Sequence, residues 1–449
     1  AKGGLRRMKK YDEYKDSGVA WIGEVPKHWK VLHLKHSLDG LQDGTHGTYA
    51  SVDAGKVLLS AKNVTEHGLI IGESERTISD IDHKEIVSNG FPQQGDILLC
   101  CVGTLGRCCI FEYPFPIAFQ RSVTFLRTNS LLSNRMLLYI LRNKYIDTQF
   151  QLFAKTSAQS GVYMGDLKDF YIVVPPINEQ TAIAAYLDTH CAKIDNLISI
   201  QQKRIALLQE LKQSVITHAV TKGLNPNVEM KQSGVEWIGD VPKHWEVMPL
   251  KKYCKMNKGL TFTKADIVDE GESVISYGQI HSKLNNGVSL DCKLIRHVPI
   301  GIVKNGEKSK AHKGDFIFAD TSEDYEGCGN FVYNDTNQAI YGGYHTIILQ
   351  TDTLNAKYIG YLFKTDCWRY QIRSRVYGVK VYSITQSILS ICSIILPPQD
   401  EQKQIASYLD HKCATIDISI SNAQHQIELL QEYKQSLITE VVTGKYKVC

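Results

Sequence analysis

The 449-residue chain lacks any long hydrophobic run and any strong excess of one charge. A membrane-spanning helix needs about 20 mostly apolar residues in succession, and no segment approaches that pattern. The first residues also lack the apolar core of a secretory signal peptide, so we expect a cytoplasmic protein. The net charge of +4 neither indicates nor excludes a nucleic-acid partner, because a local basic face decides such binding.

The sequence also lacks the motifs of several enzyme classes. Neither Pro175-Pro176 nor Pro397-Pro398 has the preceding Asn or Asp and the following aromatic residue of an amino-methyltransferase site. The segment 301–309 approaches a phosphate-binding loop, but Glu307 would place a carboxylate beside the phosphate. No Gly-x-Ser-x-Gly or His-Glu-x-x-His motif occurs. These absences argue against an autonomous methyltransferase or nuclease.

Cysteine is not scarce, but its 12 residues do not indicate disulfides in a chain of this size without a secretion signal. Four of them form two adjacent pairs, Cys100-Cys101 and Cys108-Cys109. Neighbouring residues on a strand point to opposite faces, so four such thiols would not easily converge on one metal ion. We therefore predict buried packing residues and no metal site. Cys191 and Cys413 are expected to pack in the same way.

The most informative feature present is an internal repeat with an offset of 222 residues. The segment from Glu179 carries Glu-Gln, Tyr-Leu-Asp, Ile-Asp and Lys-Gln-Ser in that order, and the segment from Glu401 carries them again. Apolar residues fall on alternating steps of three and four in both copies, and a Pro-Pro pair precedes each copy. This pattern predicts two long helices with coiled-coil seams.

A long helix cannot bury an apolar stripe alone, so we expect the two copies to pair, most simply in antiparallel orientation. The alternative is two ordinary amphipathic helices, each packed on its own domain. The predicted seam residues are Leu187, Ile194, Ile198, Ile205, Leu208, Val215, Leu409, Ile416, Ile420, Ile427, Leu430 and Leu437.

A second repeat precedes each variable block. Ser17–Trp29 returns as Ser233–Trp245 with two positions changed, and we name these two copies the clamp segments. Their Trp residues are expected to pack in the core, because Trp is costly to expose. The blocks that follow contain short β-type runs and turns, and their sequences have diverged. A copied scaffold with different inserts suggests two similar domains that recognise different targets.

These patterns predict an α+β protein with an internal pseudo-twofold repeat, in which two mixed α/β recognition domains are joined by two long helices that form an antiparallel coiled coil. The expected organisation is a tail at residues 1–16, a recognition domain at 17–176, a spacer helix at 177–224, a second recognition domain at 230–398 and a second spacer helix at 399–445.

The chain resembles the specificity subunits of type I restriction–modification enzymes. The resemblance rests on Trp-Ile-Gly-(Glu/Asp)-Val-Pro-Lys-His-Trp before each block, on Pro-Pro-x-x-Glu-Gln-x-x-Ile-Ala-x-Tyr-Leu-Asp after it, and on the long helix that follows. It implies a non-catalytic subunit whose two target recognition domains each read one half of an interrupted DNA site. It also implies docking of two methyltransferase (M) subunits and of restriction/translocase (R) subunits, with S-adenosylmethionine, ATP and Mg²⁺ on those partners.

Base reading needs side chains that donate or accept hydrogen bonds, and Gly beside them lets the backbone approach the groove. The DNA-binding candidates in the first block are Thr45, His46, Lys62, Asn63, Thr104, Arg107, Gln120, Arg121, Ser122, Gln159 and Ser160. Those in the second block are Tyr277, Gln279, Lys308, Lys310, Ser322, Tyr344, His345 and Lys380. The alternative for each is a solvated loop residue.

Two other functions fit the same sequence. The chain could serve a modification enzyme that has no nuclease, or it could be a coiled-coil scaffold that binds protein and not DNA. The target bases are not predicted, because readout depends on loop geometry and on DNA deformability.

Overall fold

The computed structural model describes residues 9–154, 161–351, 356–378 and 380–448. The chain divides into two compact units, unit 1 with residues 1–202 and 425–449 and unit 2 with residues 203–424. Each unit contains one of the predicted recognition domains and a part of each long helix.

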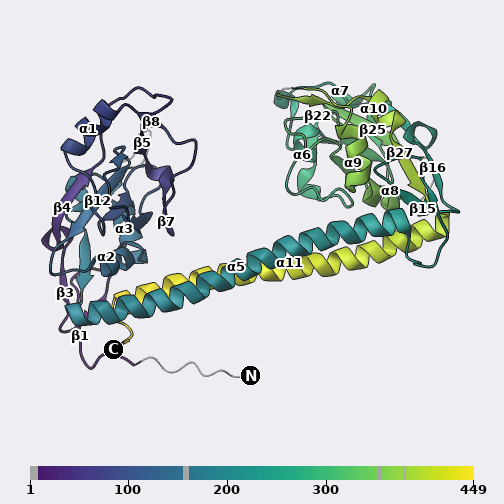
Figure 1. The fold of residues 1–449 in the computed structure, drawn as a ribbon. Helices are drawn as coiled ribbons and strands as arrows, with labels where there is room; N and C mark the ends of the chain where they lie inside the picture. The colour runs from purple at the N-terminus through teal and green to yellow at the C-terminus, as the bar shows by residue number, and fades with distance from the viewer. Residues whose placement is uncertain (1–8, 155–160, 352–355, 379, 449) are drawn as a thin grey trace. The chain divides into compact units, whose positions relative to one another are not determined.

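The long helices are α5, Ile177–Lys222, and α11, Gln399–Val442. Each begins directly after a Pro-Pro pair, as expected. In unit 1 the carboxyl-terminal part of α11 lies antiparallel to the amino-terminal part of α5, and in unit 2 the reverse parts pair in the same way (Figure 1). The predicted antiparallel helix pair and the internal repeat are therefore confirmed.

One ion pair joins the helices in each unit. Lys434 Nζ lies 2.7 Å from Asp195 in unit 1, and Lys212 Nζ lies 2.6 Å from Asp417 in unit 2. The two lysines lie at equivalent positions of the repeat and interrupt the apolar pattern in both copies. The two residue numbers of each pair add to 629, so both pairs fit the same antiparallel register of the helices. All twelve predicted seam residues are buried or half-buried.

The recognition domain of unit 1 contains two main sheets, a four-stranded sheet in the order β10-β9-β12-β4 and a three-stranded sheet in the order β11-β5-β8. Its elements, clamp included, are β1 Tyr14–Asp16, β2 Glu24–Pro26, β3 Lys30–His33, β4 Leu38–Asp43, β5 Lys56–Leu59, the short helix η2 Ala61–Asn63, β6 Val64–Thr65, β7 Gly68–Leu69, β8 Thr77–Ile78, α1 Asp80–Ser88, β9 Ile97–Cys100, β10 Cys108–Ile110, β11 Ala118–Phe119, β12 Val123–Thr128, α2 Asn134–Leu141, α3 Lys144–Phe153, α4 Met164–Leu167 and β13 Tyr171–Val174.

The recognition domain of unit 2 has a four-stranded sheet in the order β17-β25-β21-β23 and another in the order β19-β18-β24-β20. Its elements are β14 Met230–Gln232, β15 Asp240–Pro242, β16 Glu246–Pro249, β17 Lys255–Lys258, β18 Glu272–Ile275, α6 Tyr277–Ile280, β19 Arg296–Val298, α7 Ile300–Val303, η6 Glu307–Ser309, β20 Lys310–Ala311, β21 Phe316–Ala319, β22 Thr321–Ser322, β23 Phe331–Tyr333, β24 Ile340–Gly342, β25 Thr346–Gln350, α8 Ala356–Phe363, α9 Asp366–Arg373, β26 Tyr382–Ser383, α10 Gln386–Ile391 and β27 Ser393–Leu396.

The two domains share one topology despite their diverged sequences. In both, an antiparallel sheet is centred on two buried strands, β9 with β12 and β21 with β25. In both, a second sheet contains one parallel pair, β5 with β11 and β18 with β24. Every residue of β9 and β21 is buried, as expected for strands that are covered on both faces.

The clamp segments join each domain to the start of a long helix. Trp29 and Trp245 are fully buried. Their indole Nε1 atoms donate hydrogen bonds to Glu179 (3.1 Å) and Glu401 (2.8 Å) at the first turns of α5 and α11. The expected core packing is thus confirmed for this Trp of each clamp. The expectation is wrong for Trp21, because 38% of its surface is exposed.

A glycine follows the end of each long helix and packs against a clamp segment. Gly223 and Gly444 have φ angles of 79° and 72°, a conformation that favours glycine. A Cβ on Gly223 would lie 3.1 Å from the Trp245 ring, and one on Gly444 would lie 2.4 Å from Pro26. Each clamp is therefore packed between the start of one long helix and the end of the other.

We predict that Glu179→Ala lowers the free energy of unfolding by about 1–3 kcal/mol, because the buried indole of Trp29 loses its acceptor. Chemical denaturation of the purified chain measures this change. The exposed Glu210→Ala on the same helix serves as the control and should leave stability unchanged. Equal stability of Glu179→Ala and wild type would contradict a structural role for this contact.

The same contact should also depend on pH. Burial alone would raise the pKa of Glu179, but hydrogen bonds from His28, Tyr11 and Trp29 outweigh it and hold the pKa below the ordinary value. A carboxyl whose folded pKa is depressed stabilises the protein above its unfolded pKa, and that contribution disappears as the pH falls through the folded pKa. The stability difference between wild type and Glu179→Gln should therefore shrink in acid below the ordinary glutamate pKa.

Candidate nucleic-acid interface

Loops from both sheets of unit 1 meet at one end of the recognition domain. The backbone N–H of Thr45 donates to Phe119 O at 2.7 Å, and that of Gln120 donates to Leu59 O at 2.8 Å. The N–H of Cys101 donates to Ser122 O at 3.1 Å. These bonds hold together the loops after β4, after β5, between β9 and β10, and between β11 and β12. We call them the reading loops of unit 1, residues 44–49, 60–63, 101–107 and 120–122.

Unit 2 repeats this arrangement bond for bond. The backbone N–H of Leu260 donates to Gly342 O at 2.7 Å, and that of Gly343 donates to Ile275 O at 2.7 Å. The N–H of Asp320 donates to His345 O at 3.1 Å. The reading loops of unit 2 are therefore residues 259–263, 276–281, 320–330 and 343–345. Divergent sequences thus fold into one backbone arrangement in the two domains.

Most candidates of the first block lie on these loops. Thr45, His46, Lys62, Thr104, Arg107, Gln120, Arg121 and Ser122 all belong to the reading loops of unit 1. Arg107 donates to the carbonyl of Ala61, which ties the β9–β10 turn to the loop after β5. The Ser122 hydroxyl accepts from Ala61 N at 3.1 Å, so it also supports the loop. The Arg121 side chain is exposed.

In the second block the candidates on the loops are mainly aromatic. The Tyr344 ring packs edge-on against Phe262, with 5.2 Å between ring centroids, and against Tyr277, at 5.7 Å. His345 lies 5.5 Å from the Tyr277 ring and 3.2 Å from Asp320 Oδ1. Among described residues, His345 is the one non-glycine residue with a positive φ, 55°. Such conformations often occur at functional sites.

Three candidates make hydrogen bonds within the loops. Asn63 is buried, its side-chain oxygen accepts from Ser60 N and its amide donates to Ile70 O. The side-chain oxygen of Gln279 accepts the matching hydrogen bond from Ser276 N. Ser322 is buried and donates to Asp324 O. Asn63 and Ser322 expose almost no side-chain surface, and Gln279 is half-buried, so the bonds that these three side chains make hold the loops in shape.

The remaining candidates lie elsewhere. Lys308 is exposed on η6, and Lys310 lies 3.6 Å from Glu307 and over the Tyr341 ring, outside the reading loops. Lys380 is exposed near β26, which pairs with β22 in the β21–β23 connection. Gln159 and Ser160 lie outside the described residues. Sequence reasoning missed Phe262 and Asp320, although Gly259, close before Phe262, signals a close backbone approach.

Cavities open beside the loops in both units. A cavity of about 210 Å³ in unit 1 is lined in part by Thr45, His46 and Asp43. Burial raises the pKa of Asp43, although hydrogen bonds from Thr124 and His46 oppose this. A cavity of about 470 Å³ in unit 2 is lined in part by Tyr277 and His281. Some of the predicted residues therefore line part of a cavity in each domain.

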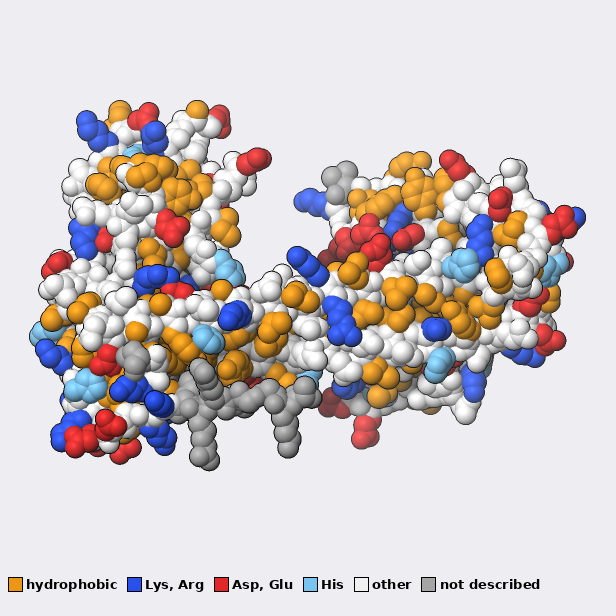
Figure 2. Space-filling view, turned by 60° about the horizontal axis from the view of Figure 1, so that its bottom comes forward, with side chains coloured by type: hydrophobic (Ala, Val, Ile, Leu, Met, Phe, Trp, Pro, Cys, Tyr) orange, Lys and Arg blue, Asp and Glu red, His pale blue; other side chains and the backbone are white. Residues whose placement is uncertain are grey.

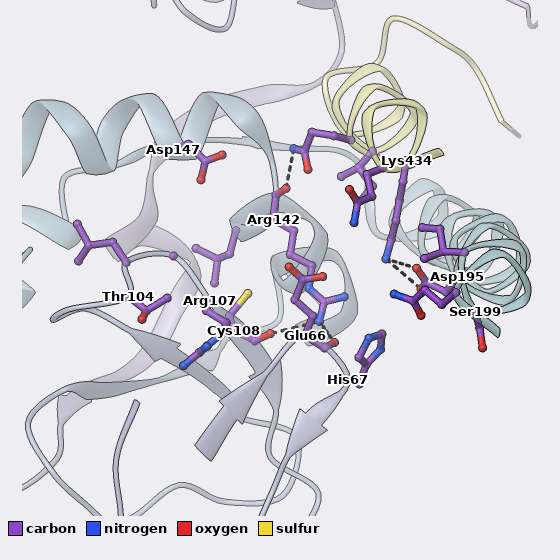
Figure 3. A pocket seen from close by; sticks show the side chains of 18 residues that line it. Glu66, His67, Thr104, Arg107, Cys108, Arg142, Asp147, Asp195, Ser199 and Lys434 are labelled. Atoms are coloured by element: carbon purple, nitrogen blue, oxygen red, sulfur yellow. Dashed lines mark hydrogen bonds and ion pairs between the residues drawn. The ribbon is translucent and has the colours of Figure 1, made fainter. Parts of the chain in front are cut away.

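A larger groove of about 810 Å³ in unit 1 lies between the β9–β10 turn and the paired helices. Figure 3 shows Lys434 reaching Asp195 on the helical side, with Arg142, Glu66 and His67 on the side of the recognition domain. Gln435 Nε2 donates to Arg142 O at the end of α2 at 3.0 Å. Lys434 thus joins the two helices, and Gln435 joins α11 to the recognition domain.

The predicted burial of these cysteines is confirmed. Cys101 and Cys108 pack in one buried cluster, whereas Cys100 and Cys109 pack in another on the opposite face of the sheet. Burial raises the pKa of Cys101 to about 12 and that of Cys108 to about 11. Within the described part of the chain, no group of three His, Cys, Asp or Glu side chains could hold a metal ion, and no helix is long and apolar enough to cross a membrane.

Comparisons with known proteins agree with this geometry. Residues 73–209 and 242–429 match the type I restriction modification DNA specificity domain. The putative MjaX specificity subunit of Methanocaldococcus jannaschii is 25% identical, over 95% of this chain and 96% of that protein. The MjaVIII specificity subunit of the same organism is 24% identical, over 82% of each chain.

Two solved structures share the fold. A chain from a type I restriction–modification system superposes with a TM-score of 0.68 at 15% identity, and covers 93% of this chain and 98% of that one. The HsdS subunit from Thermoanaerobacter tengcongensis gives a TM-score of 0.50 at 15% identity, with 94% and 98% covered. The chain therefore belongs to the type I restriction–modification DNA specificity family, the non-catalytic subunits that recognise DNA sequence in these enzymes.

Proposed function

We propose that the chain reads a bipartite duplex DNA site, one half with each recognition domain, and docks the M and R subunits that modify and cut DNA. The observation that carries this proposal is the pair of reading-loop sets, which share a backbone arrangement and differ in side chains. Two such surfaces suit two different half-sites. S-adenosylmethionine, ATP and Mg²⁺ are expected on the partner subunits, and the complex is expected to act on DNA in the cytoplasm.

The long helices are proposed to set the distance between half-sites. Neither helix contains Pro or Gly, and their seams and ion pairs keep one register, so the pair can act as a stiff spacer. A helix rises about 1.5 Å per residue, so one heptad spans roughly 10 Å, or about three base pairs of DNA.

Deletion of residues 200–206 together with residues 423–429 removes facing heptads and keeps the helix register. We predict that the preferred gap between half-sites shortens by about three base pairs, while both half-site sequences stay unchanged. Selection from random duplex pools, with M subunits present, measures both quantities. Deletion of only one of the two heptads breaks the register and is the control, which should lose binding.

An unchanged gap in the double deletion would contradict the spacer role. If the wild-type complex selected no two-part motif at all, the DNA-reading proposal itself would fail, and a protein-binding scaffold would replace it.

Docking of M is proposed at apolar positions that the paired helices leave exposed. Figure 2 shows hydrophobic side chains on the surface of these helices. Leu207 on α5 and Leu429 on α11 occupy the same repeat position and are 64% and 50% exposed. Leu211 and Tyr433 form a second equivalent pair, 50% and 48% exposed. A repeated apolar surface fits two copies of one partner.

We predict that Leu207→Glu combined with Leu429→Glu reduces the amount of M subunit that co-purifies with the chain at least tenfold, because two carboxylates would be buried without partners. The exposed Gln209→Glu on α5 adds a similar charge and should leave co-purification unchanged. Circular dichroism checks that the variants fold. Undiminished recovery of M with the double variant would place the docking surface elsewhere.

A further inference from the structure

The matched loops allow the two domains to be compared position by position. Ser122 O and His345 O accept the same backbone hydrogen bond, from Cys101 N and Asp320 N, respectively. The residues directly before them, Arg121 and Tyr344, therefore occupy one equivalent position. A similar turn is closed in each unit by a side-chain bond to Ser60 N or Ser276 N. Identical backbone supports thus present unlike side chains.

The charges on the two loop sets are opposite in kind. The reading loops of unit 1 contain three basic residues, Lys62, Arg107 and Arg121, and no Asp or Glu. The reading loops of unit 2 contain no Lys or Arg, and four carboxylates, Asp320, Glu323, Asp324 and Glu326. Shared backbone supports with differently charged side chains suggest that the two surfaces bind differently composed base sequences, although Glu326 is paired with Arg373.

Of the three cations on the reading loops of unit 1, Arg121 is the one best placed to read a base. Arg107 is engaged with Ala61 O, and Lys62 forms a 2.8 Å ion pair with Glu75. No described side chain forms an ion pair or hydrogen bond with the exposed guanidinium of Arg121. A guanidinium presents two parallel donors, and their spacing matches O6 and N7 of guanine in the major groove.

Tyr344 offers a different chemistry at the equivalent position. Its ring is fixed edge-on between Phe262 and Tyr277, and its neighbour His345 is exposed. An aromatic surface suits the C5-methyl group of thymine, an apolar feature that only an A·T pair presents in the major groove.

We propose that Arg121 and Tyr344 are the matched specificity-determining residues of the two half-sites. Arg121 binds a guanine in the half-site read by unit 1, and Tyr344 packs on the thymine of an A·T pair in the half-site read by unit 2. This inference rests on the proposed function, and it adds the class of base that each domain selects.

The test uses the complex of the full chain with M subunits and selection from random duplex pools. With Arg121→Ala, the preference for guanine at one position of one half-site should fall roughly tenfold or more. Arg121→Lys keeps the charge and loses the two parallel donors, so it should weaken the same preference while the salt dependence of binding stays as in wild type. With Tyr344→Ala, the preference for an A·T pair should fall at one position of the other half-site only.

Lys84→Ala is the matched control, because Lys84 is an exposed cation on α1, outside the reading loops. It should leave every base preference unchanged. Tyr344→Phe keeps the ring and should retain the A·T preference. This second variant shows whether a loss in Tyr344→Ala comes from the missing ring or from misfolding.

Two results would overturn the inference. The first is a wild-type motif with no guanine in one half or no A·T pair in the other. The second is an Arg121 or Tyr344 variant that weakens binding to all sequences equally, which would indicate phosphate contact or loop support. Both differ from failure of the proposed function, in which the wild-type complex selects no two-part motif.

Discussion

The structure depends on antiparallel pairing of two copies of one helical sequence. Neither copy could bury its apolar stripe alone, and each unit builds its share of the pair from α5 and α11 together. Lys212 and Lys434 interrupt the stripe, and each is neutralised by an aspartate of the other helix. Removal of one partner from a partly buried ion pair is costly, so such pairs favour one register over its neighbours.

The same helices also anchor the recognition domains. Glu179 and Glu401 accept from a buried Trp of the clamp, while Gln435 and Gln213 each cap the end of a domain helix. Tyr139 and Tyr361 donate to Asp188 and Asp410 at matched places. The motifs that identify the family are therefore mainly contacts between helix and domain. This explains why they are nearly identical in both copies, whereas the loops that face the proposed DNA are not.

Much of the fold was predictable because its signals are local. Steps of three and four residues indicate the seam, and Pro-Pro pairs indicate where the helices begin. The candidate site was harder, since its residues come from four loops far apart in the sequence. A polar residue beside a turn looks the same whether it is exposed, as Arg121 is, or supports the loop, as Asn63 does. A polar side chain supports a loop when a nearby backbone group needs a hydrogen-bond partner. Which backbone groups need one is known only once the strands are paired.

Sequencing of DNA methylated by the assembled complex tests the central claim most directly, because it reports every modified site without assumptions about the loops. A specificity subunit with two unlike readers on a stiff helical spacer should yield one motif with two different halves and a gap of constant length. A continuous motif, two identical halves or a variable gap would contradict it.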